Sequence, residues 1–224
     1  VNKEAFRENR RIKTVKLPNT LRGFGERAFE NCTALESIVI PDLVDRISES
    51  MFYGCSSLKS VGFSPSMEYI MNGAFEKSGL EFVALPKTVT SIYDFAFAEC
   101  ENLKLVYIPE TVVKNEYYAF VDCTNATIYC AAAKQPETWK ELWNEDGGKV
   151  VWGHSVPADP TLELKFATKS DGTAAVTECL SESSSVEVPM MVMVDSSAYF
   201  VTSITGQPFF NCRNLSSINV DSEN

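Results

Sequence analysis

The residues of this 224-residue chain that are best suited to chemistry are its seven cysteines. Five of them occupy the same position within a repeated sequence pattern: Cys32, Cys55, Cys100, Cys123 and Cys212. A regular series of thiols can supply metal ligands or redox-active groups, because the thiolate is both a soft metal ligand and a nucleophile. The same series can instead form a column of buried thiols that pack as small apolar groups.

The pattern favours the buried column. Asn9 and Ser78 stand at the equivalent position in two other copies, and a metal site that lost ligands in this way would lose its affinity. No pair of cysteines has the C-x-x-C spacing of zinc knuckles and thioredoxin-type motifs. We therefore predict no metal site and no cofactor. Cys130 and Cys179 lie outside the column, and the sequence leaves open whether they pair.

The single histidine, His154, limits imidazole-based catalysis to one arrangement. It stands beside Ser155 with Asp159 near, so the residue types of a hydrolytic triad are present. These residues lie in a proline-flanked segment, 153–160, which is predicted to be a linker, whereas a triad requires a rigid scaffold. The chain also has no glycine-rich phosphate loop. We therefore predict no catalytic residues and a protein that is not an enzyme.

Charge and hydrophobicity exclude two classes of partner. The net charge is −10, whereas nucleic acids and anionic membranes are bound by basic surfaces. No apolar run reaches the length of a membrane span, so we expect no membrane insertion in this segment. The chain is 45% hydrophobic, which is sufficient for a sizeable core.

The cysteines recur because the chain repeats itself. Seven copies of the pattern centre on phenylalanines: Phe6, Phe29, Phe52, Phe75, Phe97, Phe120 and, after an interruption, Phe209. In most copies the thiol position follows three residues later, three aliphatic positions come next, and a proline closes the copy. We predict a short strand with alternate side chains inward in each copy, ended by the proline. Stacked copies then bury one another's apolar faces.

The motif A-F-x-x-C-x-x-L-x-x-I-x-I-P resembles the BspA-like leucine-rich repeats over residues 5–130 and 186–224. It departs from the common leucine-rich repeat by having a cysteine before the first leucine and no Asn or Cys after the strand. The resemblance implies an α/β repeat solenoid: a right-handed leucine-rich repeat coil with parallel strands on one face, few short helices and a β-rich second block. It also implies a surface or secreted protein of gut or oral bacteria or of parasitic protozoa.

The pattern predicts four parts in the chain. Residues 1–130 form the solenoid and residues 131–152 an end cap, 153–160 the linker, and 161–224 the start of a second repeat block entered through a β-hairpin. Because the chain begins and ends within repeats, we expect it to be part of a longer protein. In the cap, Trp139, Leu142 and Trp143 follow Pro136 at helical spacing, which predicts a short amphipathic helix. The alternative role of its two tryptophans is a platform for stacking sugars.

The outward face of the strands is the predicted binding surface. The residues beside the middle inward aliphatic point to solvent, in one column of Thr14, Ser37, Ser60, Phe82 and Leu105 and a second of Lys16, Val39, Gly62, Ala84 and Tyr107. We predict that an exposed apolar cluster binds the ligand: Phe82, Ala84, Leu105 and Tyr107, together with Val39. The alternative is that a later segment folds back over this cluster.

These features favour a non-enzymatic module that recognises a protein or glycan of a host or neighbouring cell through its repeat face. The family resemblance implies an adhesion role at the cell surface or after secretion. The alternative function is that of accessory or spacer repeats in a larger surface protein or enzyme whose active domain lies outside this chain.

Overall fold

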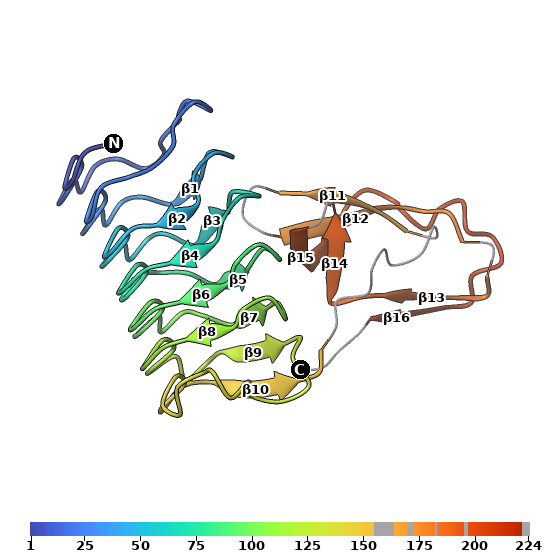
Figure 1. Ribbon diagram of the computed structural model, residues 1–224. Coiled ribbons are helices and arrows are strands. Elements are labelled where there is room, and N and C mark those ends of the chain that lie inside the picture. Colours follow the sequence, from blue (N-terminus) through green and yellow to red (C-terminus); the bar gives the residue numbers. More distant parts are fainter. Residues whose placement is uncertain (155–163, 170–172, 182, 195–196, 221–224) are drawn as a thin grey trace.

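The computed structural model of the chain describes residues 1–154, 164–169, 173–181, 183–194 and 197–220. A stack of parallel-stranded coils forms the first two thirds of the chain, and a smaller β-rich block lies beside it (Figure 1). The residues that the structure describes contain no helix. The predicted solenoid with parallel strands is therefore confirmed, the predicted α/β class with few short helices is wrong, and the handedness of the coil stays a prediction.

Two parallel strand arrays run along the solenoid. One array comprises the sheets β1–β3 and β5–β7–β9–β10: β1 (Ser37–Val39), β3 (Ser60–Gly62), β5 (Phe82–Ala84), β7 (Leu105–Ile108), β9 (Thr127–Cys130) and β10 (Lys149–Trp152). The other array is the sheet of β2 (Arg46–Ile47), β4 (Tyr69–Ile70), β6 (Ser91–Ile92) and β8 (Lys114–Asn115). Equivalent residues of successive copies pair directly, as Ile38 does with Val61 and Ile47 with Ile70.

The repeated phenylalanines form a continuous buried column. Adjacent rings from Phe6 to Phe120 stack nearly parallel, with centroids 4.9–5.6 Å apart. The amide of each buried phenylalanine donates a hydrogen bond to the next coil, as Phe52 N does to Ala74 O at 2.8 Å. The interval of 22 or 23 residues therefore keeps both the ring and the backbone of each coil in register with the next.

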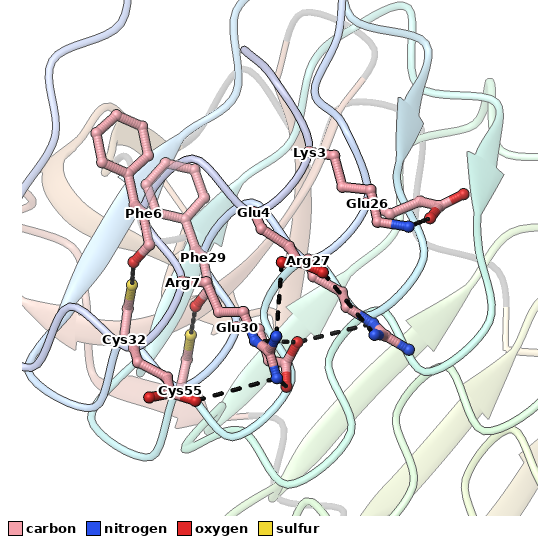
Figure 2. Close-up of polar contacts among 11 residues, drawn as sticks. Lys3, Glu4, Phe6, Arg7, Glu26, Arg27, Phe29, Glu30, Cys32 and Cys55 are labelled. Atoms are coloured by element: carbon pink, nitrogen blue, oxygen red, sulfur yellow. Dashed lines mark hydrogen bonds and ion pairs between the residues drawn. The ribbon is translucent and has the colours of Figure 1, made fainter.

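Four of the five cysteines predicted to share a column form one inside the stack: Cys32, Cys55, Cys100 and Cys123. Each thiol donates a hydrogen bond to the carbonyl oxygen of a phenylalanine in the preceding coil, as Cys32 Sγ does to Phe6 O at 3.0 Å and Cys55 Sγ to Phe29 O at 3.1 Å (Figure 2). The Ser78 hydroxyl lies 3.3 Å from Cys100 Sγ in the same column. These thiols are free and buried, so they act as small packing groups that satisfy a buried carbonyl.

Residues 136–146 form turns rather than the predicted helix. Trp139 N bonds Pro136 O at 3.1 Å, and Lys140 N bonds Asn115 O of the preceding coil at 2.9 Å. Such turns also place residues that are three positions apart on the same side of the chain. The apolar spacing that predicted a helix is therefore compatible with turns as well. Trp139 and Trp143 are buried, and Trp143 meets Phe120 edge-on at 5.8 Å. They are therefore not a sugar-stacking platform.

The second block combines a four-stranded sheet with a short parallel pair. The sheet contains β11 (Leu164–Thr168), β12 (Thr173–Cys179), β14 (Met191–Val194) and β15 (Ser197–Ile204), in the order β11–β12–β15–β14. β13 (Ser185–Val188) pairs in parallel with β16 (Ser217–Val220). The antiparallel pairing of β11 and β12 agrees with the hairpin expected there. A disulfide joins Cys179 to Cys212, so Cys179 does not pair with Cys130, which is free.

Phe75→Ala is expected to lower the free energy of unfolding by about 3–5 kcal/mol, because it removes a fully buried ring and leaves a cavity between two others. Urea unfolding followed by circular dichroism measures this loss. Phe210→Ala is the control, since Phe210 is 78% exposed and its loss should change stability by less than about 0.5 kcal/mol. Equal effects of the two substitutions would contradict the buried column.

The solenoid is expected to lose stability at alkaline pH through its buried thiols. Burial raises the pKa of Cys55, and it raises the pKa of Cys130 to about 12. The free energy of unfolding is unaffected by the ionisation of these thiols at neutral pH, where they are protonated in both the folded and the unfolded chain. It falls as the pH rises past the ordinary thiol pKa of about 8.5, because the thiols of the unfolded chain lose their protons while those of the folded chain keep them. Urea titrations at pH 7.5 and 10 should show that Cys130→Ala loses less stability than the wild type, by about 1–2 kcal/mol. The same loss in both would refute this origin.

Candidate functional site

Most of the predicted ligand-binding residues do not form an open surface. One is buried and three are half-buried: Tyr107, Phe82, Ala84 and Leu105. Met191 and Phe200 of the second block pack against them, and the ring centroids of Phe82 and Phe200 lie 6.2 Å apart. β15 therefore lies against β5, as Figure 1 shows. The prediction that these four residues form an exposed cluster is wrong, because packing an apolar strand face on another apolar surface lowers the free energy.

The remaining part of the strand face is mostly polar. Val39 on β1 is 54% exposed, and its neighbours in the same array include Ser37 and Ser60. Beside these strands, Lys59 and Lys104 both form ion pairs with Glu81, at 3.3 and 2.8 Å. Val39 is thus a single exposed apolar residue on this face, and a role for the predicted residues in ligand binding stays a prediction.

The structure places an exposed group of aromatic side chains elsewhere, directly after β6 and β8. We call it the aromatic patch: Tyr93, Phe95, Tyr117 and Tyr118. Phe95 is 43% exposed and Tyr117 is 44% exposed. The rings of Phe95 and Tyr118 stack at 5.3 Å with an interplanar angle of 21°, and Tyr117 lies 6.2 Å from Tyr118. β6 and β8 lie on the side of the solenoid away from the second block (Figure 1).

Two of these aromatic residues have a backbone conformation that bulky side chains rarely adopt. Phe95 has φ of 57° and Tyr118 has φ of 60°. Each coil places one residue in this left-handed position, and the two preceding coils use Ser50 and Gly73. A bulky residue there is strained by roughly 1–2 kcal/mol, and the Phe95 side chain, which is 43% exposed, recovers only part of this through burial. Strain that packing does not explain is typical of functional sites.

Charged groups surround the patch in equal number. Lys114 Nζ lies 4.1 Å from the centroid of the Tyr93 ring, and Lys140 Nζ lies 5.4 Å from that of Tyr117. Glu116 forms an ion pair with Lys114 at 3.0 Å, and this hydrogen-bonded contact raises the pKa of the Lys114 ammonium. The Asp94 carboxylate accepts a hydrogen bond from the amide of Tyr117 at 3.1 Å. Two ammonium and two carboxylate groups leave the patch without net formal charge.

The described residues that were considered for catalysis or metal binding do not form a catalytic or metal-binding group. The His154 ring lies 4.7 Å from the ring of Tyr129, while Ser155 and Asp159 lie outside the described residues. Within the described ranges, no group of three or more His, Cys, Asp or Glu side chains is placed to hold a metal ion. The same ranges contain no helix that is long and apolar enough to cross a membrane.

The aromatic patch was missed by sequence reasoning, although a signal existed. Phe95 and Tyr118 are 23 residues apart and occupy the repeat position at which Glu4, Arg27, Ser50 and Gly73 stand in the earlier copies. A hydrophobic residue at a position otherwise held by polar residues or glycine marks an outward aromatic. The spacing alone does not reveal that this repeat position has a left-handed backbone conformation, and that conformation is what makes an aromatic residue there unusual.

Phe200→Ser is expected to release the second block from the strand face, because it removes the ring that covers Phe82 at a cost of about 3 kcal/mol. Hydrogen–deuterium exchange should show faster exchange of the β14 and β15 amides, while the amides of Phe52 and Phe75 keep their protection. Val39→Ser, an exposed change on the same face, is the control. Unchanged exchange in β14 and β15 would show that other contacts hold the block.

Residues 1–104 match the BspA type leucine rich repeat region in six copies. None of the curated proteins matches the chain. The crystal structure of a T. pallidum leucine rich repeat protein is 31% identical, with a TM-score of 0.57 over 61% of this chain and 63% of that chain.

Two further solved structures are more distant. A leucine-rich repeat protein from Bacteroides ovatus is 20% identical, with a TM-score of 0.48 over 98% of this chain and 64% of that chain. A leucine rich cell surface protein from Faecalibacterium prausnitzii is 16% identical, with a TM-score of 0.42 over 99% and 76% of the two chains. The chain thus spans less than two thirds of the T. pallidum and B. ovatus proteins. The six matched repeats of residues 1–104 and the stacked parallel coils thus make this part of the chain similar to the BspA type leucine rich repeat region.

Proposed function

We propose that this chain is a non-catalytic binding module of a cell-surface or secreted protein, and that the aromatic patch is the surface that contacts its ligand. The observation that carries this proposal is the stacked pair of Phe95, which is exposed, and Tyr118, which is half-buried, both in the left-handed backbone conformation. Solenoids present extended surfaces on a rigid stack of coils, and exposed aromatic groups on such surfaces are typical of recognition sites.

The strand face is the weaker candidate for this role. Its apolar part already packs against Met191 and Phe200, so a ligand would first have to displace the second block. The aromatic patch needs no such displacement. We also propose that residues 131–152 act as the end cap of the solenoid, since Trp139 and Trp143 bury apolar surface of the last phenylalanine-bearing coil.

The disulfide supports the proposed location. Cys179 and Cys212 are joined, and such bonds persist in oxidising environments such as the cell surface and the extracellular space. The five free thiols are buried, so an oxidising environment does not threaten them. A surface location is also what the resemblance to BspA-like repeats implies.

The proposal is tested by attaching the chain to beads and measuring their retention on mucin and on collagen. We expect saturable retention on at least one surface, and a reduction of about tenfold when Phe95 and Tyr118 are both replaced by glycine. Tyr53→Ser is the matched control, because Tyr53 also carries a lysine over its ring, at 5.6 Å, but lies outside the patch. No saturable retention on either surface would overturn the proposal in favour of a spacer.

A further inference from the structure

We infer that the aromatic patch binds a neutral oligosaccharide, with the ring of Phe95 as its main stacking surface. This inference rests on the proposed function, because it names the ligand class of the same surface. It is carried by three features of the patch: the geometry of the rings, the balance of the charges beside them, and the conformation of the backbone that presents them.

The Phe95 ring is stacked on one side, and the side chain is 43% exposed. Tyr118 stacks on it at 5.3 Å from the following coil. In the preceding coil the equivalent residue is Gly73, which shares the left-handed conformation with φ of 58°. A pyranose ring has an apolar face of C–H groups, and such a face packs on an aromatic ring as another ring does. No ring from the preceding coil extends the pair of Phe95 and Tyr118, because the equivalent residue there is Gly73, and the polar atoms nearest to its Cβ position are Glu76 Oε2 and Ser50 Oγ. A sugar ring that packs on the exposed part of Phe95 would have these two oxygen atoms near its hydroxyl groups.

The charged groups favour a neutral ligand that both donates and accepts hydrogen bonds. Lys114 and Lys140 are donors, while Asp94 and Glu116 are acceptors, and their formal charges cancel. Sugar hydroxyls can pair with both kinds of group. An anionic glycan is disfavoured because the chain carries a net charge of −10. A proline-rich peptide also packs on aromatic surfaces, but its proline residues offer carbonyl acceptors and no donors.

The size of the patch indicates a short bound segment. Its exposed rings come from two neighbouring coils, which follow one another at the spacing of paired strands, about 4.8 Å. The hydrogen-bonded coils fix this spacing, since Phe95 N donates to Tyr117 O at 3.2 Å. The fold thus positions the rings before a ligand binds, so binding requires little ordering of the protein.

Isothermal titration calorimetry with three defined probes tests the inference. The probes are neutral hexasaccharides (cellohexaose and mannohexaose), a heparin hexasaccharide and a proline decapeptide. We expect at least one neutral hexasaccharide to bind, and Phe95→Gly to weaken its affinity by about tenfold. The melting temperature of this variant should change little, because glycine relieves the left-handed strain at the position where Gly73 already stands.

A second variant leaves all four rings in place. Gly73→Asn adds a side chain at the repeat position that lies one coil before Phe95, and asparagine tolerates the left-handed conformation. The new Cβ would lie 3.2 Å from Glu76 Oε2 and 3.4 Å from Ser50 Oγ, which are the ends of side chains that can move. We expect weaker hexasaccharide binding in this variant and unchanged binding in the control Tyr53→Ser.

The outcomes separate this inference from the proposed function. Retention on mucin that is lost in the Phe95 and Tyr118 variant, without binding of any neutral hexasaccharide, overturns the ligand class and leaves the proposed function standing. Binding of the heparin probe or the proline decapeptide at the patch, in place of the neutral sugars, does the same. Hexasaccharide binding that is unchanged in Phe95→Gly and in Gly73→Asn shows that sugars bind elsewhere and overturns the inference.

Discussion

The register between successive coils is the constraint from which the rest of the structure follows. Each buried phenylalanine stacks on its counterpart one coil away and donates its amide to that coil, so ring and backbone enforce the same interval. A coil alone has no partner for its apolar face or for its amides. The cysteine column depends on the same register, because each thiol reaches a carbonyl of the preceding coil.

That register also fixes where the chain is strained. Tight turns on both sides of the phenylalanine put two residues of each coil in the left-handed conformation, and many of these residues are not glycine. Lys77 and Glu99, for example, extend into solvent and pair with each other at 3.2 Å. Phe95 and Tyr118 differ from them, because Phe95 leaves an apolar ring 43% exposed and Tyr118 is only half-buried. Their position is consistent with the contact surface proposed above, which the stack would hold rigid.

The two faces of the solenoid consequently differ in whether the chain covers them. The strand face is apolar at Phe82 and Tyr107, and the chain covers it with Phe200. The side that bears the aromatic patch combines rings with balanced charges, so it can remain in contact with water without a cover. A binding module needs both properties: a scaffold stabilised by burial within the chain, and a surface that is left for a ligand.

The sequence by itself determined the repeat, the inward phenylalanine and cysteine columns, and the parallel strands. It could do so because each of these contacts recurs once in every coil, and a contact that recurs at a fixed interval leaves a periodic pattern in the sequence. Only the tertiary structure decided that Cys179 pairs with Cys212, that Phe200 covers Phe82, and that residues 136–146 are turns. The disulfide and the contact between Phe200 and Phe82 join segments that do not belong to the same repeat, so no periodic pattern announces them. The spacing of apolar residues in 136–146 suits a helix and a series of turns equally, so it could not distinguish the two. The aromatic patch lies between the two cases: its rings are periodic in the sequence, but their strain and exposure exist only in the folded coil.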